Sequence, residues 1–262
     1  MALALSFETV GSGPPLLVLH GLFGSSSNWR GIARQLAATH TVITVDLRNH
    51  GASPWADAMG YVEMANDVLQ LIDRLGLKAP AVMGHSMGGK TAMALALKHP
   101  QRVGQLFVVD IAPVVYADQQ TPFADAMRGA DVMAAASRAE VQGRLQQAVS
   151  DPGVVPFLMQ NLVMHNAHFD WRINLMGISA AMPQLCGFPS ELLGASYAGP
   201  LTVIAGRDSD YVVQLDGAAF RPMFPRVEVQ VVEGAGHWVH ADQPAAFVAC
   251  VRHALREAAP VA

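Results

Sequence analysis

The sequence has few of the features that mark secreted, membrane or nucleic-acid-binding proteins. Its two cysteines, Cys186 and Cys250, fit neither a CxxC motif nor a metal site, so we expect both to be reduced and buried in a cytoplasmic protein. The 17 Lys and Arg residues against 21 Asp and Glu give a net charge of −4, which argues against nucleic acid as a main partner. No apolar run is long enough to span a membrane.

Apolar residues are plentiful. They make up 52% of the 262 positions, enough for one large domain with a sizeable core. Short apolar strands alternate with helical patterns in the first part of the chain and again near its end. The predicted strands are 2–10, 16–20, 41–46, 81–84, 105–110, 201–206 and 227–234, and the predicted helices are 28–38, 61–75, 87–98 and 242–258. This alternation predicts an α/β fold, with a mostly parallel sheet and helices on both faces.

Residues 113–195 interrupt the alternation. They show no clear strand, contain helical stretches such as 123–148, and include many apolar and aromatic residues. We therefore predict that residues 113–195, hereafter the insertion, form a helical cap between two strands of a core made of residues 1–112 and 196–262. An insertion there would lie over the carboxyl ends of the strands, where open α/β sheets bind ligands.

A serine interrupts the apolar stretch Val82–Pro100 in the pattern Gly84-x-Ser86-x-Gly88. Small residues two positions on either side let a strand run directly into a helix and leave the serine exposed above the sheet, as in a nucleophile elbow. The backbone N–H of Met87 would open the helix and point at negative charge developing beside Ser86. An ordinary glycine-rich turn between strand and helix is the alternative interpretation.

Four segments in order along the chain carry a resemblance to a known family. They are "LLVLHGLFGSSSNW", "VDLRNHGAS", "GHSMGG" and "GAGHWVHADQP". In content and order they resemble the α/β-hydrolases, over nearly the whole chain. The combination of "HGLFGS", "RNHG", "GHSMGGK" and "VVDIAPVVY" is most similar to the YbfF-type small bacterial esterases and their mammalian mitochondrial relatives. The resemblance implies the α/β-hydrolase fold and serine hydrolase chemistry that needs neither a metal nor an organic cofactor.

The resemblance also implies His237 as the general base, because a glycine-bounded loop can carry an imidazole over the sheet edge. His240 is a weaker candidate. Most family members place the acid after the penultimate strand, where the usual register falls on Ser209 and the neighbouring Asp208 is one candidate. The YbfF-type enzymes resemble this sequence at Asp110, which ends an earlier strand. We favour Asp110 as the acid and keep Asp208 as the alternative.

The loop "HGLFG" after the second strand lies where the family places its second oxyanion donor. We expect the N–H of Leu22 to act with that of Met87, and the N–H of Phe23 is the next candidate. The side chains of Phe23, His85 and Trp238 are expected to contact the substrate.

Together these residues predict a serine hydrolase that cleaves a small-molecule ester, or a thioester such as an acyl-CoA, with an apolar acyl group through an acyl-enzyme on Ser86. No Lys and Arg cluster suits the phosphates of CoA. Ser86 argues against a dehalogenase, which needs Asp at this position. Carbon–carbon bond hydrolases and perhydrolases keep the same three residues, and a ligand receptor with slow turnover is a further alternative. The sequence leaves the acyl length and the oligomeric state open.

Overall fold

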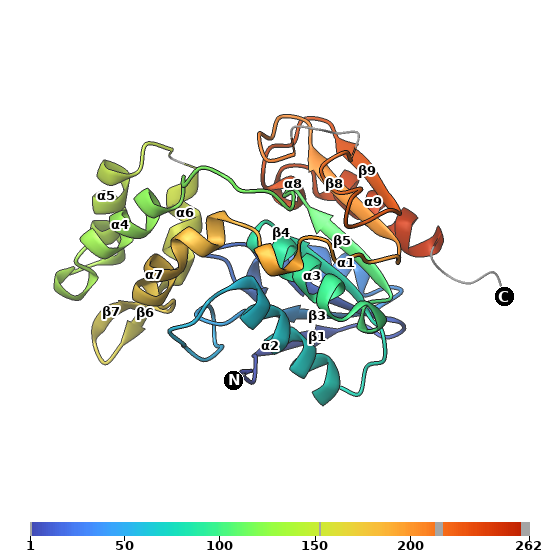
Figure 1. Cartoon of the computed structure of the whole chain (residues 1–262). Helices are drawn as coiled ribbons and strands as arrows, with labels where there is room; N and C mark the ends of the chain where they lie inside the picture. Colours follow the sequence, from blue (N-terminus) through green and yellow to red (C-terminus); the bar gives the residue numbers. More distant parts are fainter. Residues whose placement is uncertain (1, 152, 213–216, 258–262) are drawn as a thin grey trace.

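The computed structural model describes residues 2–151, 153–212 and 217–257. Its centre is a seven-stranded sheet with the order β1-β3-β2-β4-β5-β8-β9 (Figure 1). The strands are β1 (Phe7–Val10), β2 (Pro15–Leu19), β3 (Thr41–Val45), β4 (Ala81–His85), β5 (Gln105–Val109), β8 (Leu201–Gly206) and β9 (Val227–Val232). β1 runs antiparallel to β3, and all other neighbours in this sheet are parallel. The predicted fold class is confirmed.

Helices cover both faces of the sheet (Figure 1). One face carries α1 (Arg30–Leu36) and α9 (Pro244–Glu257), and the other carries α2 (Tyr61–Arg74) and α3 (Met87–Lys98). In β2, Leu16 and Val18 belong to the core beneath α1 and α9, whereas Leu17 and Leu19 belong to the core beneath α2 and α3. Because both faces of the central strands β2, β4, β5 and β8 are buried, these strands are apolar at nearly every position, as in parallel sheets generally.

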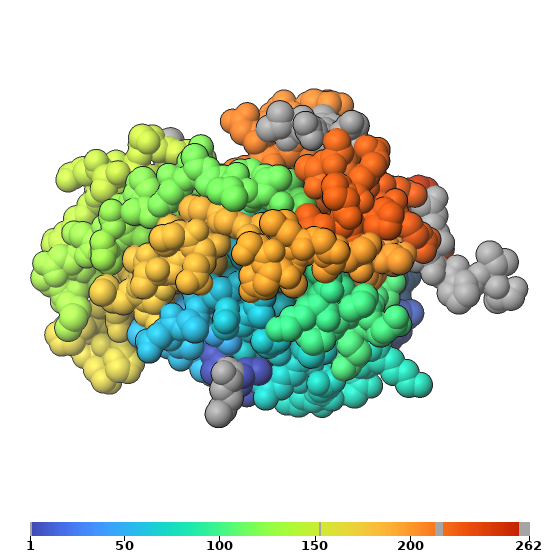
Figure 2. All heavy atoms as spheres, in the orientation of Figure 1, coloured from blue at the N-terminus to red at the C-terminus, as the bar shows by residue number. Residues whose placement is uncertain are grey.

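The insertion lies between β5 and β8 and forms the left part of the molecule in Figure 1. In the space-filling view its atoms, green to yellow, adjoin those of the core across this face (Figure 2). Its elements are α4 (Thr121–Gly129), η3 (Val132–Ala134), α5 (Arg138–Ala148), α6 (Val154–Leu158), η4 (Met159–Asn161), β6 (Leu162–His165), β7 (His168–Trp171), α7 (Leu175–Cys186) and η5 (Ser190–Leu192). Shorter elements of the core are η1 (Ser26–Trp29), η2 (Pro100–Arg102) and α8 (Val239–Asp242).

The insertion contains a strand pair that the sequence pattern does not predict. β6 and β7 pair antiparallel through a two-residue turn at Asn166 and Ala167, whose φ angles are 47° and 68°. Turns of this type usually carry Asn-Gly, so Asn-Ala gives little signal. The helical stretch expected at 123–148 is divided into α4 and α5, because Asp131 adopts a left-handed conformation with a φ of 42°.

Several predicted element ends differ by a few residues, and two of these differences have a clear structural cause. Of the strand expected at 2–10 only β1 forms, because the N–H groups of Leu3 and Ser6 donate to the side chains of Asp67 (2.6 Å) and Ser53 (2.8 Å). The helix expected at 242–258 begins at Pro244, which suits the first turn of a helix, where its missing N–H leaves no bond unmade.

Parts of three predictions lie outside the described residues: residue 258 of that last helix, residue 152 of the insertion, and residues 1, 213–216 and 258–262 of the core. Both cysteines are free thiols, and they are half-buried rather than buried. Within the described ranges, each helix is too short or too polar to cross a bilayer.

Candidate active site

Ser86 stands between β4 and α3 in a backbone conformation that a serine rarely adopts, with φ 52° and ψ −118°. The turn is held because the Ser86 N–H donates to the carbonyl of Val109 at 3.0 Å. A Cβ atom on Gly84 would lie 2.0 Å from the Gly88 carbonyl oxygen, and one on Gly88 would lie 2.5 Å from the carbonyl oxygens of Leu19 and His20. The spacing of the two glycines is therefore set by the close approach of strand, helix and the neighbouring β2.

The loop after β2 abuts this serine. A Cβ atom on Gly21 would lie 3.3 Å from the Cβ of Ser86. The N–H of Phe23, whose φ is 60°, donates to Nε2 of His50 at 3.2 Å. Among the hydrogen bonds of the described residues, none uses the N–H of Leu22 or of Met87. These two N–H groups, from the loop and from the first residue of α3, are therefore available to a ligand beside Ser86.

His50 explains why the N–H of Phe23 is engaged. Nδ1 of His50 donates to the carbonyl of Arg48 at 2.9 Å, which leaves Nε2 as the acceptor. Burial lowers the pKa of His50 to about 3, so the ring stays neutral. His20 is buried beside it and bonds the carbonyl of Gly21 at 2.7 Å, which braces the same loop.

His237 and Asp110 form a direct pair. Nδ1 of His237 lies 2.8 Å from Oδ2 of Asp110, and Asp110 is fully buried at the end of β5. The same carboxylate accepts the N–H of Gly206 at 3.0 Å on Oδ1 and the hydroxyl of Ser209 on Oδ2. This pairing makes Nδ1 the donor and leaves Nε2 of His237 as the proton-accepting nitrogen.

The two candidate acids lie in different surroundings. Asp208 is exposed, and its backbone N–H donates to the carbonyl of Ala235 at 2.9 Å. The next residue, Ser209, occupies the register where the acid was expected, and its hydroxyl binds Asp110. The geometry thus brings Asp110 and Ser209 to His237 and leaves the Asp208 side chain at the surface.

Two tyrosines that the sequence patterns did not predict complete the surroundings of His237. The ring of Tyr211 stacks on His237 with centroids 3.9 Å apart and an interplanar angle of 22°. The hydroxyl of Tyr116 donates to the carbonyl of Tyr211 at 2.6 Å and accepts the N–H of Ala112 at 2.8 Å. The only signal for Tyr211 in the sequence is its place two residues after Ser209.

The other histidines near the site support the loop that carries His237. Nε2 of His85 donates to the carbonyl of His237 at 2.9 Å, and burial lowers the pKa of His85 well below its usual value. His240 stacks on Trp29 with centroids 4.2 Å apart, and burial lowers its pKa to about 4. Both rings therefore stay neutral at physiological pH. In the described parts of the chain no group of three or more His, Cys, Asp or Glu side chains is placed to hold a metal ion.

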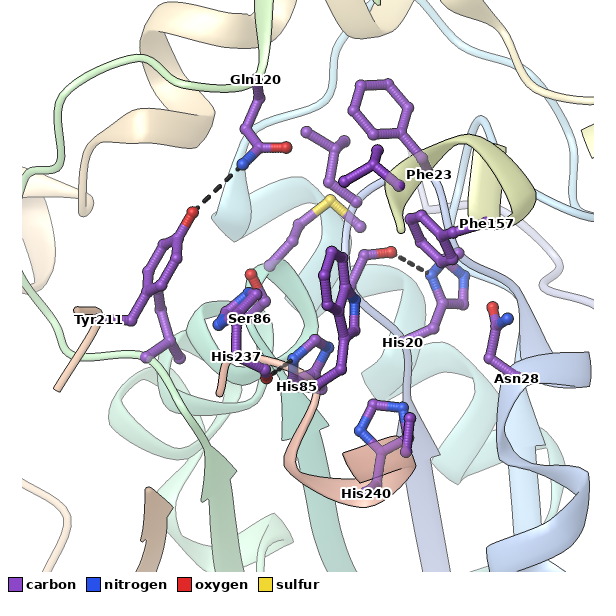
Figure 3. A pocket seen from close by; sticks show the side chains of 18 of the residues that line it. His20, Phe23, Asn28, His85, Ser86, Gln120, Phe157, Tyr211, His237 and His240 are labelled. Carbon is purple, nitrogen blue, oxygen red and sulfur yellow. Dashed lines mark hydrogen bonds between the residues drawn. The ribbon is translucent and has the colours of Figure 1, made fainter. Parts of the chain in front are cut away.

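A cavity of about 1040 Å³ opens at Ser86 and His237 and extends beneath the insertion. Figure 3 shows Ser86, His237, Tyr211 and Phe157 around it. The core contributes the residues predicted to contact substrate, Phe23, His85 and Trp238, together with Leu22. The insertion contributes the apolar side chains of Phe123, Phe157, Met182 and Leu185.

The cavity wall carries little positive charge. Lys90 is the one Lys or Arg among the described residues that line it, and its ammonium donates to three backbone carbonyls. The acidic residues of the wall are Asp151 and Asp242, both exposed. A phosphate group entering this cavity would find no free cation among the described side chains that line it.

Comparison with known proteins identifies the family. A family model described as alpha/beta hydrolase fold matches residues 14–244. The chain is 38% identical over 244 residues to the sn-1-specific diacylglycerol lipase ABHD11 of Xenopus tropicalis, covering 90% of this chain and 76% of that protein. It is 34% identical over 244 residues to esterase YbfF of Escherichia coli, covering 93% of each chain.

A solved structure of an esterase also matches this chain in both fold and sequence. A marine microorganism esterase matches with a TM-score of 0.92 at 34% identity, covering 96% of this chain and 99% of that one. The resemblance to the YbfF-type esterases is confirmed. The chain belongs to the α/β-hydrolase family.

Proposed function

We propose that the protein is a serine hydrolase that cleaves neutral carboxylic esters with an apolar acyl group through an acyl-enzyme on Ser86. The observation that carries the proposal is the bond between His237 Nδ1 and the buried Asp110, beside a cavity that also holds Ser86. Relatives named esterase and diacylglycerol lipase agree with a carboxylic ester hydrolase. The insertion would act as the cap of the site, and the low cysteine content favours the cytoplasm.

The first half of the reaction forms the acyl-enzyme. Oγ of Ser86 attacks the ester carbonyl while Nε2 of His237 takes the hydroxyl proton. The carbonyl oxygen becomes an anion that the N–H groups of Met87 and Leu22 bind, an interaction that strengthens as charge develops. The carbon–oxygen bond to the alcohol then breaks, and His237 gives its proton to the departing alcohol oxygen. Asp110 holds the imidazole in the tautomer that leaves Nε2 free.

The second half releases the acid. A water molecule loses a proton to Nε2 of His237 and attacks the acyl carbonyl, and the same two N–H groups hold the second oxyanion. The bond between the carbonyl carbon and Oγ breaks, and Ser86 regains its proton from His237. The strained backbone at Ser86 serves this chemistry, because it presents Oγ at the start of α3, where the helix amides point.

The cavity supports an apolar acyl group and an uncharged leaving group. Phe123, Phe157, Met182 and Leu185 offer apolar surface from the insertion. The hydrogens of Lys90 are engaged by backbone carbonyls, and Asp151 and Asp242 would repel an anion. A neutral ester therefore suits the site better than the thioester of CoA, whose phosphates bring several negative charges.

A substrate panel tests the proposal. Purified protein is assayed with p-nitrophenyl esters of graded chain length, with acyl-CoA, and with the same acyl group on N-acetylcysteamine, a thioester without phosphates. We expect rapid turnover of the nitrophenyl esters and a preference for the cysteamine thioester over acyl-CoA. Turnover of none of these compounds would contradict the proposal and favour a carbon–carbon bond hydrolase, a perhydrolase or a slow ligand receptor.

A further inference from the structure

The side chain of Lys90 is buried one helical turn after Ser86, between the two ends of the insertion. Nζ donates to the carbonyl of Val114, where the chain enters the insertion, at 2.8 Å. It also donates to the carbonyls of Cys186 (3.2 Å) and Gly187 (2.5 Å), near the point where the chain leaves it. All three hydrogens of the ammonium group therefore hold main-chain atoms of the insertion.

No carboxylate forms an ion pair with this ammonium in the described part of the chain. Nζ lies instead 4.7 Å from the ring centroid of Tyr116 and 5.7 Å from that of Tyr61. Lys90 is only 1% exposed, and burial of a charge without a counter-ion is costly. An apolar side chain of similar length would fill the space without that cost, so packing alone does not account for a lysine here.

A chain of contacts joins this lysine to His237. The N–H of Tyr116 donates to the carbonyl of Cys186 at 2.9 Å, so the two ends of the insertion are bonded to each other beneath Nζ. The hydroxyl of Tyr116 donates to the carbonyl of Tyr211 at 2.6 Å. The Tyr211 ring in turn stacks on His237. A displacement of the insertion at this point would move Tyr116, and with it the ring that packs on the imidazole.

We propose that Lys90 is a positioning residue that holds both ends of the insertion against α3 and thereby fixes the roof of the acyl cavity and the stacking of Tyr211 on His237. The inference rests on the proposed function, because it takes the cavity beneath the insertion as the acyl site. A lysine that only stabilised the fold would change the melting temperature but neither the acyl-length preference nor the pH dependence of turnover.

The pH dependence follows from the groups that face Lys90. They are Tyr61 from α2, Tyr116 from the segment before α4, and the thiol of Cys186 at the end of α7, beside the ionised Asp118. Burial lowers the pKa of Lys90 to about 8 and raises the pKa of all three neighbouring neutral groups, that of Tyr116 to about 12. As pH rises, Lys90 is therefore the first of them to lose a proton. The neutral amine has two hydrogens for three carbonyls, so one carbonyl of the insertion loses its donor.

The test compares Lys90→Met with Lys98→Met, a matched change on the exposed end of the same helix. We measure kcat and KM for p-nitrophenyl acetate and octanoate from neutral to alkaline pH. In Lys90→Met we expect kcat/KM to fall about 10-fold or more for octanoate and less than about 3-fold for acetate. Wild type and Lys98→Met should lose octanoate preference as pH rises past about 8, whereas Lys90→Met should show no such change.

A folded Lys90→Met variant with the chain-length preference and alkaline behaviour of Lys98→Met would overturn the proposal. If circular dichroism shows that Lys90→Met does not fold, the pH dependence of the wild-type protein tests the proposal by itself. An octanoate-to-acetate ratio that stays constant on either side of about pH 8 then overturns it. Inactivity of wild type toward every ester would instead contradict the proposed function.

Discussion

Ser209 donates its hydroxyl hydrogen to Oδ2 of Asp110, a carboxylate 99 residues earlier in the chain. The two residues come from the loops that follow β8 and β5, neighbouring strands of the sheet. The position where most family members would carry the acid therefore holds a serine that binds an acid from the adjacent strand. The same Asp110 oxygen accepts Nδ1–H of His237, so serine and imidazole share one acceptor.

The first prediction concerns the choice of acid. Replacing Asp110 by Asn keeps the shape of the side chain but allows the wrong imidazole tautomer, so we expect kcat to fall about 10²–10⁴-fold near neutral pH. Asp208→Asn, an exposed change in the same region, should lower kcat by less than about 10-fold. Thermal melts of both variants control for folding. If Asp208→Asn lost most of its kcat while Asp110→Asn kept the wild-type value, the acid would be assigned to the later loop.

The second prediction isolates the hydroxyl of Ser209. Ser209→Ala removes one charge-assisted hydrogen bond from Asp110 and the acceptor of the Tyr211 N–H, but it leaves the bond from His237, so we expect kcat to fall about 10-fold while KM changes little. Steady-state kinetics with a nitrophenyl ester measure both constants. A loss as large as that of Asp110→Asn would show instead that the hydroxyl is indispensable to the pair.

The third prediction concerns the nucleophile. A fluorophosphonate should modify one residue per chain and abolish turnover, because Ser86 lines the same cavity as His237, the proposed base. Ser86→Ala should lose about 10⁴-fold or more in kcat while the protein stays folded. Peptide mass spectrometry locates the label. A label on another serine, or full activity of Ser86→Ala, would refute the assignment.

The fourth prediction concerns acyl length. Met182 lies on the cavity wall, whereas Met176, on the same helix α7, is 69% exposed. Met182→Trp should shorten the reach of the cavity and shift the preferred nitrophenyl ester toward shorter chains, with a smaller effect on acetate. Met176→Trp is the matched control and should leave the profile unchanged. Identical acyl-length profiles for the two variants would show that this wall of the cavity does not determine substrate choice, and would contradict the prediction.

The fifth prediction concerns stability in acid. Burial lowers the pKa of His240 to about 4 in the folded protein, below its ordinary value of 6.5. Between these two values the unfolded chain binds the proton more strongly, so the free energy of unfolding falls as pH drops through this window. His240→Phe should reduce that slope by up to about 1.4 kcal/mol per pH unit, the value for one proton. Urea melts at several pH values measure how the free energy of unfolding changes with pH. His165→Phe, on the exposed hairpin, is the control and should keep the wild-type slope. Equal slopes for His240→Phe and wild type would contradict the prediction.

The elbow and the sheet could be predicted because local sequence determines them. Gly84 is required by backbone contacts within one strand–turn–helix unit, Gly88 is required by the close approach of β2, and α3 begins and ends where the pattern indicated. The β6–β7 hairpin was missed because its turn residues, Asn166 and Ala167, carry no glycine. Strong local sequence signals therefore predicted the correct helices and strands, whereas the weak turn signal of the hairpin did not.

The surroundings of the site were harder to predict, because contacts distant in sequence create them. Asp110 and Asp208 both follow strands at the same sheet edge, and only the side-chain geometry separates the buried one from the exposed one. Lys90 stands in a helix where a lysine would ordinarily be expected at the surface. Its burial depends on Val114, Cys186 and Gly187, which are up to 97 residues away.

The bond between Tyr116 N–H and the carbonyl of Cys186 makes the beginning and the end of the insertion neighbours in space. A segment whose ends meet can be shortened, lengthened or exchanged for another without moving the strands that flank it. The core would then keep its elbow and its histidine loop while the segment above them diverged. The proposed function would then place the chemistry in the core and the choice of substrate in the exchangeable segment beyond Tyr116.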